Sequence, residues 1–183
     1  RRDQHGLLGA LIRPIFAADS LAQARDRLSE AVAHLDGSVV FITGASGGPR
    51  AVAVDSSHVY WTNSSFGAIG RADLNGQNVN QSFITGGAQN EGLAVDSGHI
   101  YWTNRDSGTI GRADLNGQNV TQSFITGTTA PQGVAVDSGH IYWAHIPAIA
   151  TFNIARADLD GQHVNPSFIT GGFQISGVAV DAG

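Results

Sequence analysis

The sequence contains no cysteine and no methionine, and all ten of its basic residues are arginine. Without cysteine the chain can form neither a disulfide framework nor a thiolate metal site, and its redox compartment stays open. No run of apolar residues approaches the roughly 18 that a membrane-spanning helix needs. The exclusive use of arginine is typical of a high-GC coding sequence of bacterial type.

Charge is scarce as well, because Asp, Glu, Lys and Arg make up only 14% of the 183 residues. The formal net charge is −5, and no stripe of arginine runs along residues 37–183. Proteins that bind nucleic acid carry clustered positive charge on one face or element. The composition therefore argues against nucleic acid as a partner of this part of the chain.

What the sequence does have is a repeat. Asp55, Asp96 and Asp137 follow one another at intervals of 41 residues, and Asp181 comes 44 residues later. Each interval holds four short runs rich in β-branched and aromatic residues, which favour strands. Turn sequences such as Asn116-Gly117 separate these runs. Four strands in such an interval, without a helical period, predict one blade of a β-propeller.

The fold prediction is an all-β, incomplete β-propeller of four-stranded antiparallel blades, preceded by an α-helical N-terminal segment. Propellers typically have about 4–8 blades, so the number of repeats closes no ring. We expect open blade edges, which favour self-association. The partial propeller covers 37–183, with complete repeats at 51–91, 92–132 and 133–176 and partial strands at 38–44 and 177–181.

Residues 1–36 form a helical N-terminal extension in this prediction. Apolar residues recur at helical spacing, and Ser20 can cap a second helix. The segment is a poor signal peptide, because Arg13 and Pro14 interrupt its apolar stretch. The stretches 12–20 and 24–28 resemble a helical segment of mutator-type transposases, which implies a fusion remnant without transposase activity. The alternative is an amphipathic helix that covers the open side of the propeller.

Several motifs recur in register within the repeats. They are the Tyr-Trp-Thr-Asn of 60–63 and 101–104, the Arg-Ala-Asp-Leu-Asn-Gly of 71–76 and 112–117, and the Gly-Val-Ala-Val-Asp of 133–137. These motifs resemble the YWTD repeat, also called the low-density lipoprotein receptor class B repeat. NHL-like and streptogramin-lyase-like propellers are more distantly similar. The resemblance implies a six-bladed propeller that acts as a binding module, secreted or at the cell surface.

This sequence departs from the YWTD motif at its fourth position. Asn63 and Asn104 stand where the family has Asp, and the third copy has Ala144-His145. The resemblance therefore implies no role of the family's Asp for these positions.

The residues that repeat are interpreted as scaffold. Blades stacked face to face bury both faces of a strand, so the tyrosines and tryptophans at 60–61, 101–102 and 142–143 are expected between blades. His58, His99 and His140 are interpreted as turn residues rather than metal ligands, because equivalent atoms in successive blades lie too far apart to share an ion. The arginines at 71, 112 and 156 with the aspartates at 73, 114 and 158 are expected to form a structural charge ladder between blades.

The connections that differ between copies are the candidate binding surface. Strand direction alternates, so second-to-third and fourth-to-first connections gather at one end of the blades, and these connections vary most. Binding residues lie preferentially on loops held by a rigid scaffold. The loop 144–154 carries a three-residue insertion with exposed apolar side chains. The candidate ligand-binding residues are Arg50, Phe66, Glu91, Arg105, Asp106, Gln132, His145, Phe152, Phe173 and Gln174.

Three functions stay open at this stage. The first is a non-enzymatic module that binds a protein, peptide or carbohydrate through the variable loops. The second is a propeller enzyme that resembles streptogramin lyases or lactonases, with His145 or Glu91 as a general base. The third is a vestigial structural fragment. No metal or cofactor is expected in any of them.

Overall fold

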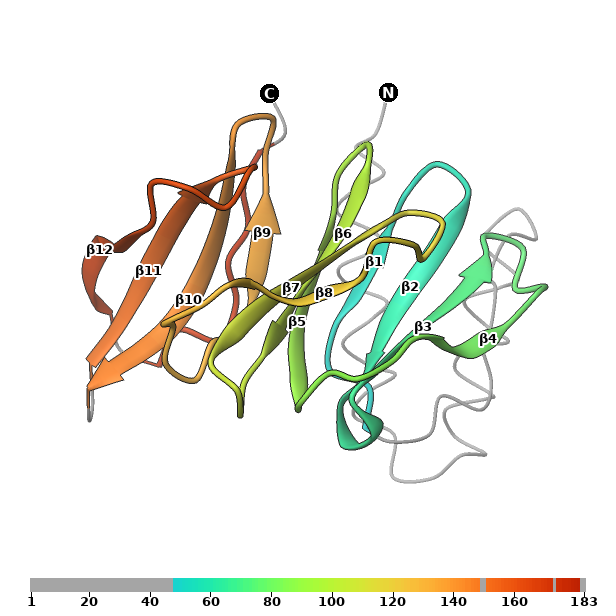
Figure 1. Ribbon diagram of the computed structural model, residues 1–183, viewed down its shortest axis with the longest axis horizontal. Helices are drawn as coiled ribbons and strands as arrows, with labels where there is room; N and C mark the ends of the chain where they lie inside the picture. Colours follow the sequence, from blue (N-terminus) through green and yellow to red (C-terminus); the bar gives the residue numbers. More distant parts are fainter. Residues whose placement is uncertain (1–47, 149–150, 173, 182–183) are drawn as a thin grey trace, which may run out of the picture. The chain divides into compact units, whose positions relative to one another are not determined.

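All the described strands belong to three four-stranded antiparallel sheets (Figure 1). The structure, a computed structural model, describes residues 48–148, 151–172 and 174–181. The first sheet contains β1 (Val52–Val54), β2 (His58–Asn63), β3 (Ala68–Asp73) and β4 (Asn80–Ile84), with a 3-10 turn, η1 (Ser64–Phe66), between β2 and β3. The second contains β5 (Asn90–Val95), β6 (His99–Asn104), β7 (Thr109–Asp114) and β8 (Thr121–Ile125). The third contains β9 (Val134–Val136), β10 (His140–Ala148), β11 (Thr151–Asp158) and β12 (Asn165–Gly172).

The same turn chemistry sets the strand register in every sheet. In the second sheet, the Asp96 carboxylate accepts hydrogen bonds from the backbone N–H groups of Gly98 (2.7 Å) and His99 (2.6 Å). This closes the turn between β5 and β6 and places Leu93 opposite Trp102. The corresponding pairs are Val52 with Trp61 in the first sheet and Val134 with Trp143 in the third.

The sheets pack face to face in chain order. We call the side of a sheet that contacts the preceding sheet its upstream face, and the opposite side its downstream face. Between the first two sheets, Tyr60, Ile69 and Ile84 pack against Leu93, Ile100, Trp102 and Ala113. Between the last two, Ala94, Tyr101, Ile110 and Ile125 pack against Val134, Ile141, Trp143, Ala155 and Ala157. Tyr60, Tyr101, Trp102 and Trp143 therefore lie in the inter-sheet core, as predicted, whereas Trp61 and Tyr142 lie on the outer faces of the first and third sheets.

Tryptophan on the second strand is accommodated by glycine on the third. Trp61 lies opposite Gly70 and Trp102 opposite Gly111. A Cβ atom added to either glycine would lie 2.2 Å from the indole Cε2 atom. The indole N–H groups then donate to the Gln81 and Gln122 side chains at 3.1 and 3.0 Å.

The expected charge ladder is wrong in its pairing. Arg71 and Arg112 instead lie over the rings of Phe83 and Phe124, with the guanidinium carbon 4.0 and 3.9 Å from the ring centre. Each arginine also donates to a backbone carbonyl of the next sheet, at Leu115 (3.3 Å) and Leu159 (3.2 Å). Stacking satisfies the flat guanidinium without a carboxylate.

The expected loop at 144–154 is also wrong. β10 and β11 run past the ends of their counterparts, and Ala148 pairs with Thr151 after an irregularity in the register. The insertion therefore lengthens a hairpin, because extended strands satisfy their backbone groups with one another.

Several other expectations concern segments at the ends of the chain. Residues 1–36, with the transposase resemblance, and the partial strand 38–44 lie outside the described residues. Residues 177–181 are described but form no strand, since no second strand lies beside them in the part that the structure describes. Within that part, no helix has the length and hydropathy to cross a membrane.

Candidate functional site

The variable connections meet at one end of the sheets, as predicted. The Gly87 N–H donates to the Gly67 carbonyl at 2.8 Å, which joins the β4–β5 connection to the β2–β3 connection. Gly67 has a φ of 57°, and a Cβ atom there would lie 2.0 Å from the Gly87 oxygen. Only glycine fits both the left-handed backbone and this close approach. The close approach is repeated at Gly108, which has a φ of 64° and where a Cβ atom would lie 2.3 Å from the Thr128 oxygen.

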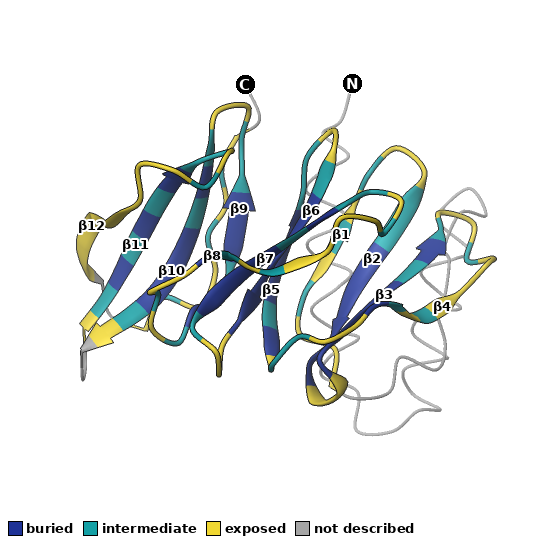
Figure 2. Ribbon diagram, in the orientation of Figure 1, coloured by how far each residue is buried: buried dark blue, intermediate teal, exposed yellow. Residues whose placement is uncertain are grey.

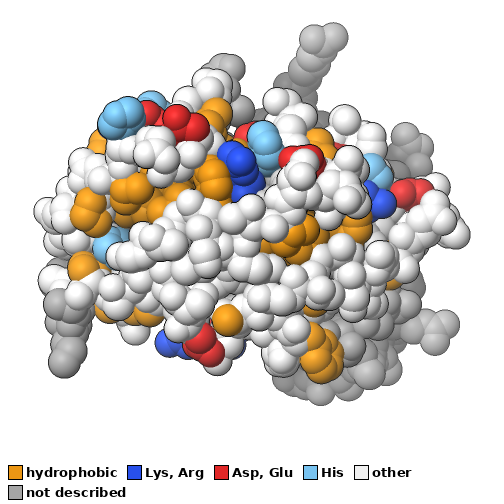
Figure 3. All heavy atoms as spheres, viewed as in Figure 1, with side chains coloured by type: hydrophobic (Ala, Val, Ile, Leu, Met, Phe, Trp, Pro, Cys, Tyr) orange, Lys and Arg blue, Asp and Glu red, His pale blue; other side chains and the backbone are white. Residues whose placement is uncertain are grey.

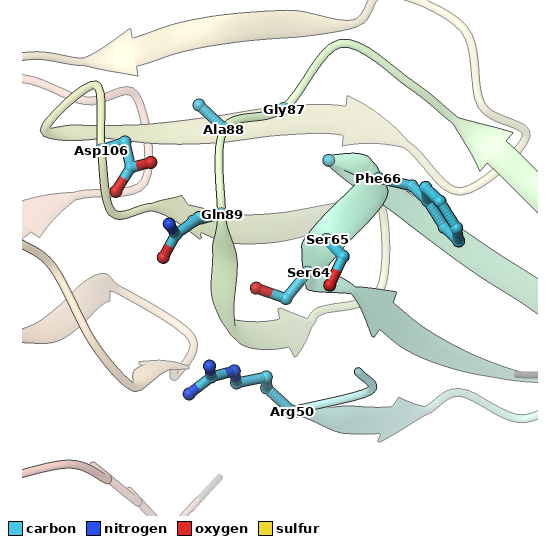
Figure 4. A pocket seen from close by; sticks show the side chains of 9 residues that line it. Arg50, Ser64, Ser65, Phe66, Gly87, Ala88, Gln89 and Asp106 are labelled. Atoms are coloured by element: carbon cyan, nitrogen blue, oxygen red, sulfur yellow. The ribbon is translucent and has the colours of Figure 1, made fainter. Parts of the chain in front are cut away.

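A hollow of about 460 Å³ lies at this end, between connections of the first and second sheets (Figure 4). The polar ends of Arg50, Ser64 and Gln89 point into the same space, whereas the Phe66 ring points away from them. Phe66 is 68% exposed, which is unusual for a phenylalanine. The lining residues are Arg50, Ser64, Ser65, Phe66, Gly67, Gly87, Ala88, Gln89 and Asp106.

Arg50 and Glu91 form an ion pair at the edge of this hollow. Arg50 Nη1 lies 3.2 Å from Glu91 Oε2. The Arg50 side chain is 55% exposed, whereas the Glu91 side chain is 10% exposed. Glu91 therefore orients the guanidinium, and the exposed arginine is the partner that can meet a ligand.

Arg105 and Asp106 extend the charged surface of the hollow. The backbone N–H groups of Arg105 and Asp106 donate to the carbonyls of Gln89 (3.1 Å) and Ala88 (3.4 Å). The Arg105 guanidinium reaches the Gln89 side-chain oxygen at 3.5 Å. These bonds hold the β4–β5 connection against the β6–β7 connection. The Arg105 and Asp106 residues are exposed there.

Other predicted binding residues lie outside the hollow. The half-buried Gln132 donates from its side-chain amide to the Ala130 carbonyl at 3.3 Å. Phe152 is half-buried in β11 and pairs with Gly172 of β12. Gln174 is exposed, with a φ of 46°. Phe173 lies outside the described residues.

His145 is a structural residue in this geometry. It is 3% exposed, and its Nε2 lies 2.7 Å from the Pro166 carbonyl oxygen. Because a carbonyl only accepts, Nε2 carries a proton. Asn63 and Asn104 donate to the carbonyls of Gln81 and Gln122 at the matching positions. His145 thus takes the place of an asparagine that ties the second strand to the fourth.

His145 and Glu91, the two candidates for a general base, have separate partners. Among the described residues no hydrogen bond or ion pair joins the two, since Glu91 pairs with Arg50 and His145 with Pro166. A general base must reach the proton that it removes. In this geometry neither side chain is placed to take a proton from the other.

At the opposite end of the sheets, each first turn carries a Tyr–Asp hydrogen bond. The Tyr60 hydroxyl donates to Asp55 Oδ2 at 2.8 Å. Burial, together with this carboxylate, raises the pKa of Tyr60, and the same holds for Tyr101 and Tyr142. Burial also acts to raise the pKa of Asp55, but hydrogen bonds from the Ser57 N–H and Tyr60 outweigh it and lower the pKa.

The three turn histidines lie between aspartates of their own sheet. His58 Nδ1 is 3.5 Å from Asp55 Oδ1, and its Nε2 is 3.9 Å from Asp73 Oδ1. His99 and His140 repeat this arrangement. In the described part of the chain, no group of His, Cys, Asp or Glu could hold a metal ion.

The variable end brings together groups that can contact a ligand. It offers an oriented arginine, an exposed carboxylate, hydroxyl and amide groups and an exposed aromatic ring, all held on short connections. Sequence reasoning missed Ser64, Ser65 and Gln89 as lining residues. The signal was present, because all three lie in connections that differ between the repeats.

Comparison with protein families finds one match. Residues 57–97 and 98–138 match the low-density lipoprotein receptor repeat class B. The two matches together cover less than half of the chain. Each runs from the second strand of one sheet to the first strand of the next, so a family repeat is shared between two sheets. No curated protein matches the chain in sequence.

Solved structures share the fold. A chain in a crystal structure of a nidogen/laminin complex is 29% identical with a TM-score of 0.57, over 64% of this chain and 46% of that chain. A catalytically inactive virginiamycin B lyase from Staphylococcus aureus, with quinupristin, is 22% identical with a TM-score of 0.53, over 67% and 42%. The computationally designed Ika4 protein is 16% identical with a TM-score of 0.56, over 75% and 82%.

These likenesses identify the three sheets as blades of a β-propeller fold. The chain spans less than half of the nidogen/laminin chain and of the lyase chain. The lyase and the designed protein share the fold alone.

Proposed function

We propose that this chain is a non-enzymatic binding module that recognises a protein or peptide through the hollow at Arg50, Phe66 and Asp106. The observation that carries the proposal is the contrast between the two ends of the sheets. The turns at one end repeat almost unchanged, whereas the connections that line the hollow differ from copy to copy. A rigid scaffold with individual loops is the usual design of a recognition surface.

The chemistry of the hollow favours a polypeptide partner. Arginine and aromatic side chains dominate the binding energy of protein interfaces. Here Arg50 is oriented by Glu91, and Phe66 is exposed at the rim. Asp106 adds a carboxylate on the other side. The class B repeat and the nidogen/laminin neighbour, a complex between proteins, support the same conclusion.

An enzymatic function has less support. The lyase neighbour shares the fold at 22% identity. His145 Nε2 already donates to the Pro166 carbonyl and so links β10 to β12. Fold likeness by itself does not carry an activity.

The proposal is tested by selecting peptides on the immobilised chain from a random 12-residue phage library. Selected peptides should bind the Phe66→Ala and Asp106→Asn variants at least roughly tenfold more weakly, because an exposed aromatic ring and an exposed carboxylate are the side chains that a partner can contact. Isothermal titration calorimetry measures the affinities.

Val79→Ala is the matched control, because Val79 is 43% exposed but lies in the β3–β4 connection, outside the lining of the hollow. Peptides that bind Phe66→Ala as tightly as the unaltered chain would overturn the proposed site. Retention of glycans in place of peptides would overturn the proposed class of partner.

A further inference from the structure

The downstream face of the third sheet has the composition of an inter-sheet contact but lacks a neighbour among the described residues. We propose that it docks a polypeptide segment that supplies the second, third and fourth strands of a further repeat. This surface is separate from the hollow at the variable end, so the inference stands independently of the proposed function.

The two contacts inside the molecule define what such a face looks like. The downstream faces of the first and second sheets each present a tyrosine from the second strand and an isoleucine from both the third and the fourth strand. In the second sheet these are Tyr101, Ile110 and Ile125, which are 0%, 0% and 2% exposed beneath the third sheet.

The third sheet repeats this face without cover. Tyr142, Ile154 and Ile169 occupy the same positions, and Ile169 is 50% exposed. Ile154 of β11 is half-buried, whereas its counterpart Ile110 of β7 is buried. Figure 2 shows the alternation of buried and half-buried residues along β11. Hydrophobic side chains gather on the surface where Figure 1 places β11 and β12 (Figure 3). An exposed apolar face of this kind marks a contact surface.

Arg156 is held on this face in the position from which the equivalent arginines donate to the next sheet. Its guanidinium carbon lies 4.5 Å from the centre of the Phe168 ring, as Arg71 and Arg112 lie over Phe83 and Phe124. Those two arginines donate to the carbonyl of a leucine in the third-to-fourth turn of the next sheet. For Arg156 no carbonyl of a further sheet is present in the part that the structure describes. The docked segment would supply it.

The segment that corresponds to the first strand of a repeat already lies beside the third sheet. Gly133 contacts Ser176, Gly177 and Val178, and the Gly133 N–H donates to the Ser176 carbonyl at 3.0 Å. Gly92 contacts Gln132 to Val134 in the same way. Residues 177–180 read Gly-Val-Ala-Val, as residues 133–136 do. They hydrogen-bond into no strand among the described residues, so their edge is open to strand addition.

The occupant follows from these features. A second strand that pairs with Val178–Val180 in the common register would place its tryptophan opposite Val178 and its tyrosine opposite Ala179. A complete second copy would bring its own β1 to the place that residues 177–180 already fill. The fitting partner is therefore a three-stranded segment of the Tyr-Trp-Thr-Asn type, without a first strand.

A synthetic peptide with the sequence of residues 99–127 of this chain tests the inference. It contains β6, β7 and β8. Fluorescence anisotropy of the labelled peptide should show saturable binding to the full chain. Hydrogen exchange at residues 177–180 and in β12 should slow by at least roughly tenfold, because strand pairing protects amides.

Ile169→Asp should abolish both effects. Val164→Asp should abolish neither, because Val164 and its counterparts Val79 and Val120 are all 43% exposed, with or without a neighbouring sheet. A second form of the experiment appends residues 99–127 directly after Gly183, where Asp181-Ala182-Gly183 would replace the Asp96-Ser97-Gly98 turn. The appended chain should show the same protection and a higher Tm than a version with Trp102→Asp in the appended segment.

Three outcomes would overturn the inference. The first is an absence of added protection at 177–180 in both experiments. The second is equal binding to Ile169→Asp. The third is a dimer, detected by sedimentation velocity, that buries β12 and excludes the peptide, because the occupant would then be a second copy.

Discussion

At the scale of the residue, the contact between tryptophan and glycine shows how the sequence sets the packing. Gly70 and Gly111 leave room for an indole ring on the neighbouring strand. The third repeat has Ala155 opposite Trp143, and the Trp143 N–H donates to Thr128 at 3.0 Å instead of to a glutamine. Where alanine replaces glycine opposite the tryptophan, the indole N–H thus donates to a threonine and not to a glutamine.

Gly111→Ala tests this contact. The added Cβ atom would lie 2.2 Å from the Trp102 ring, which is buried and cannot move away freely. We expect a loss of about 1–3 kcal/mol in the free energy of unfolding, as for overpacked cores. Urea denaturation followed by tryptophan fluorescence measures it.

Gly98→Ala is the control, because the nearest atom to its added Cβ would be 3.8 Å away. This variant should unfold at nearly the same urea concentration as the unaltered chain. Equal stability of the Gly111 and Gly98 variants would show that the indole ring has room to shift.

At the scale of the element, the link between the second and fourth strands explains the departures from the repeat motif. Asn63 ties β2 to β4, and Asn104 ties β6 to β8. His145 ties β10 to β12 through the Pro166 carbonyl. The fourth strand lies at the edge of its sheet and pairs with the third strand alone, so this bond adds a direct link from the second strand to the outer strand.

Substitution of His145 separates this structural role from catalysis. His145→Asn should lower the free energy of unfolding by less than about 1 kcal/mol, because asparagine makes this bond in the other sheets. His145→Ala should lower it by about 2 kcal/mol, because it leaves a buried carbonyl without its donor and removes packed atoms.

Thermal denaturation of both variants, together with the affinity of a peptide selected on the hollow, measures the two roles. The asparagine variant should keep that affinity. If His145→Asn were as unstable as His145→Ala, the equivalence of histidine and asparagine at this position would be wrong.

At the scale of the whole molecule, the three sheets differ in how much they are covered. The second sheet is packed on both faces, and β6 and β7 are almost wholly buried. β12 is exposed along its length where the structure describes its side chains. Opening free energy follows the number of buried apolar contacts. The third sheet should therefore open more readily than the second.

Native-state hydrogen exchange tests this gradient. Amides of β8 should exchange at least roughly tenfold more slowly than the matching amides of β12, because Ile125 is packed beneath the third sheet and Ile169 is exposed. Mass spectrometry of peptic fragments from the two strands measures the rates. Equal protection of β8 and β12 would mean that another surface covers the third sheet in solution.

The sequence by itself determined the repeat, the four strands in each unit and the end of the sheets where the variable connections meet. It could do so because turn residues and strand-forming residues act locally, and because antiparallel strands alternate in direction. The same reasoning placed Arg50, Phe66 and Asp106 at the variable end, where they line the hollow. The hairpin at β10 and β11 was not, because Pro147 and the inserted residues resemble a loop until pairing across the hairpin is known.

Only the tertiary structure decided the partners of the charged and polar side chains. Arg71 and Arg112 stack on a phenylalanine ring and donate to a carbonyl of the next sheet. His145 donates to the Pro166 carbonyl. These partners lie from 12 residues away, as between Arg112 and Phe124, to 47 residues away, as between Arg112 and Leu159. A side chain's neighbours depend on the stacking of whole sheets, which no local pattern encodes.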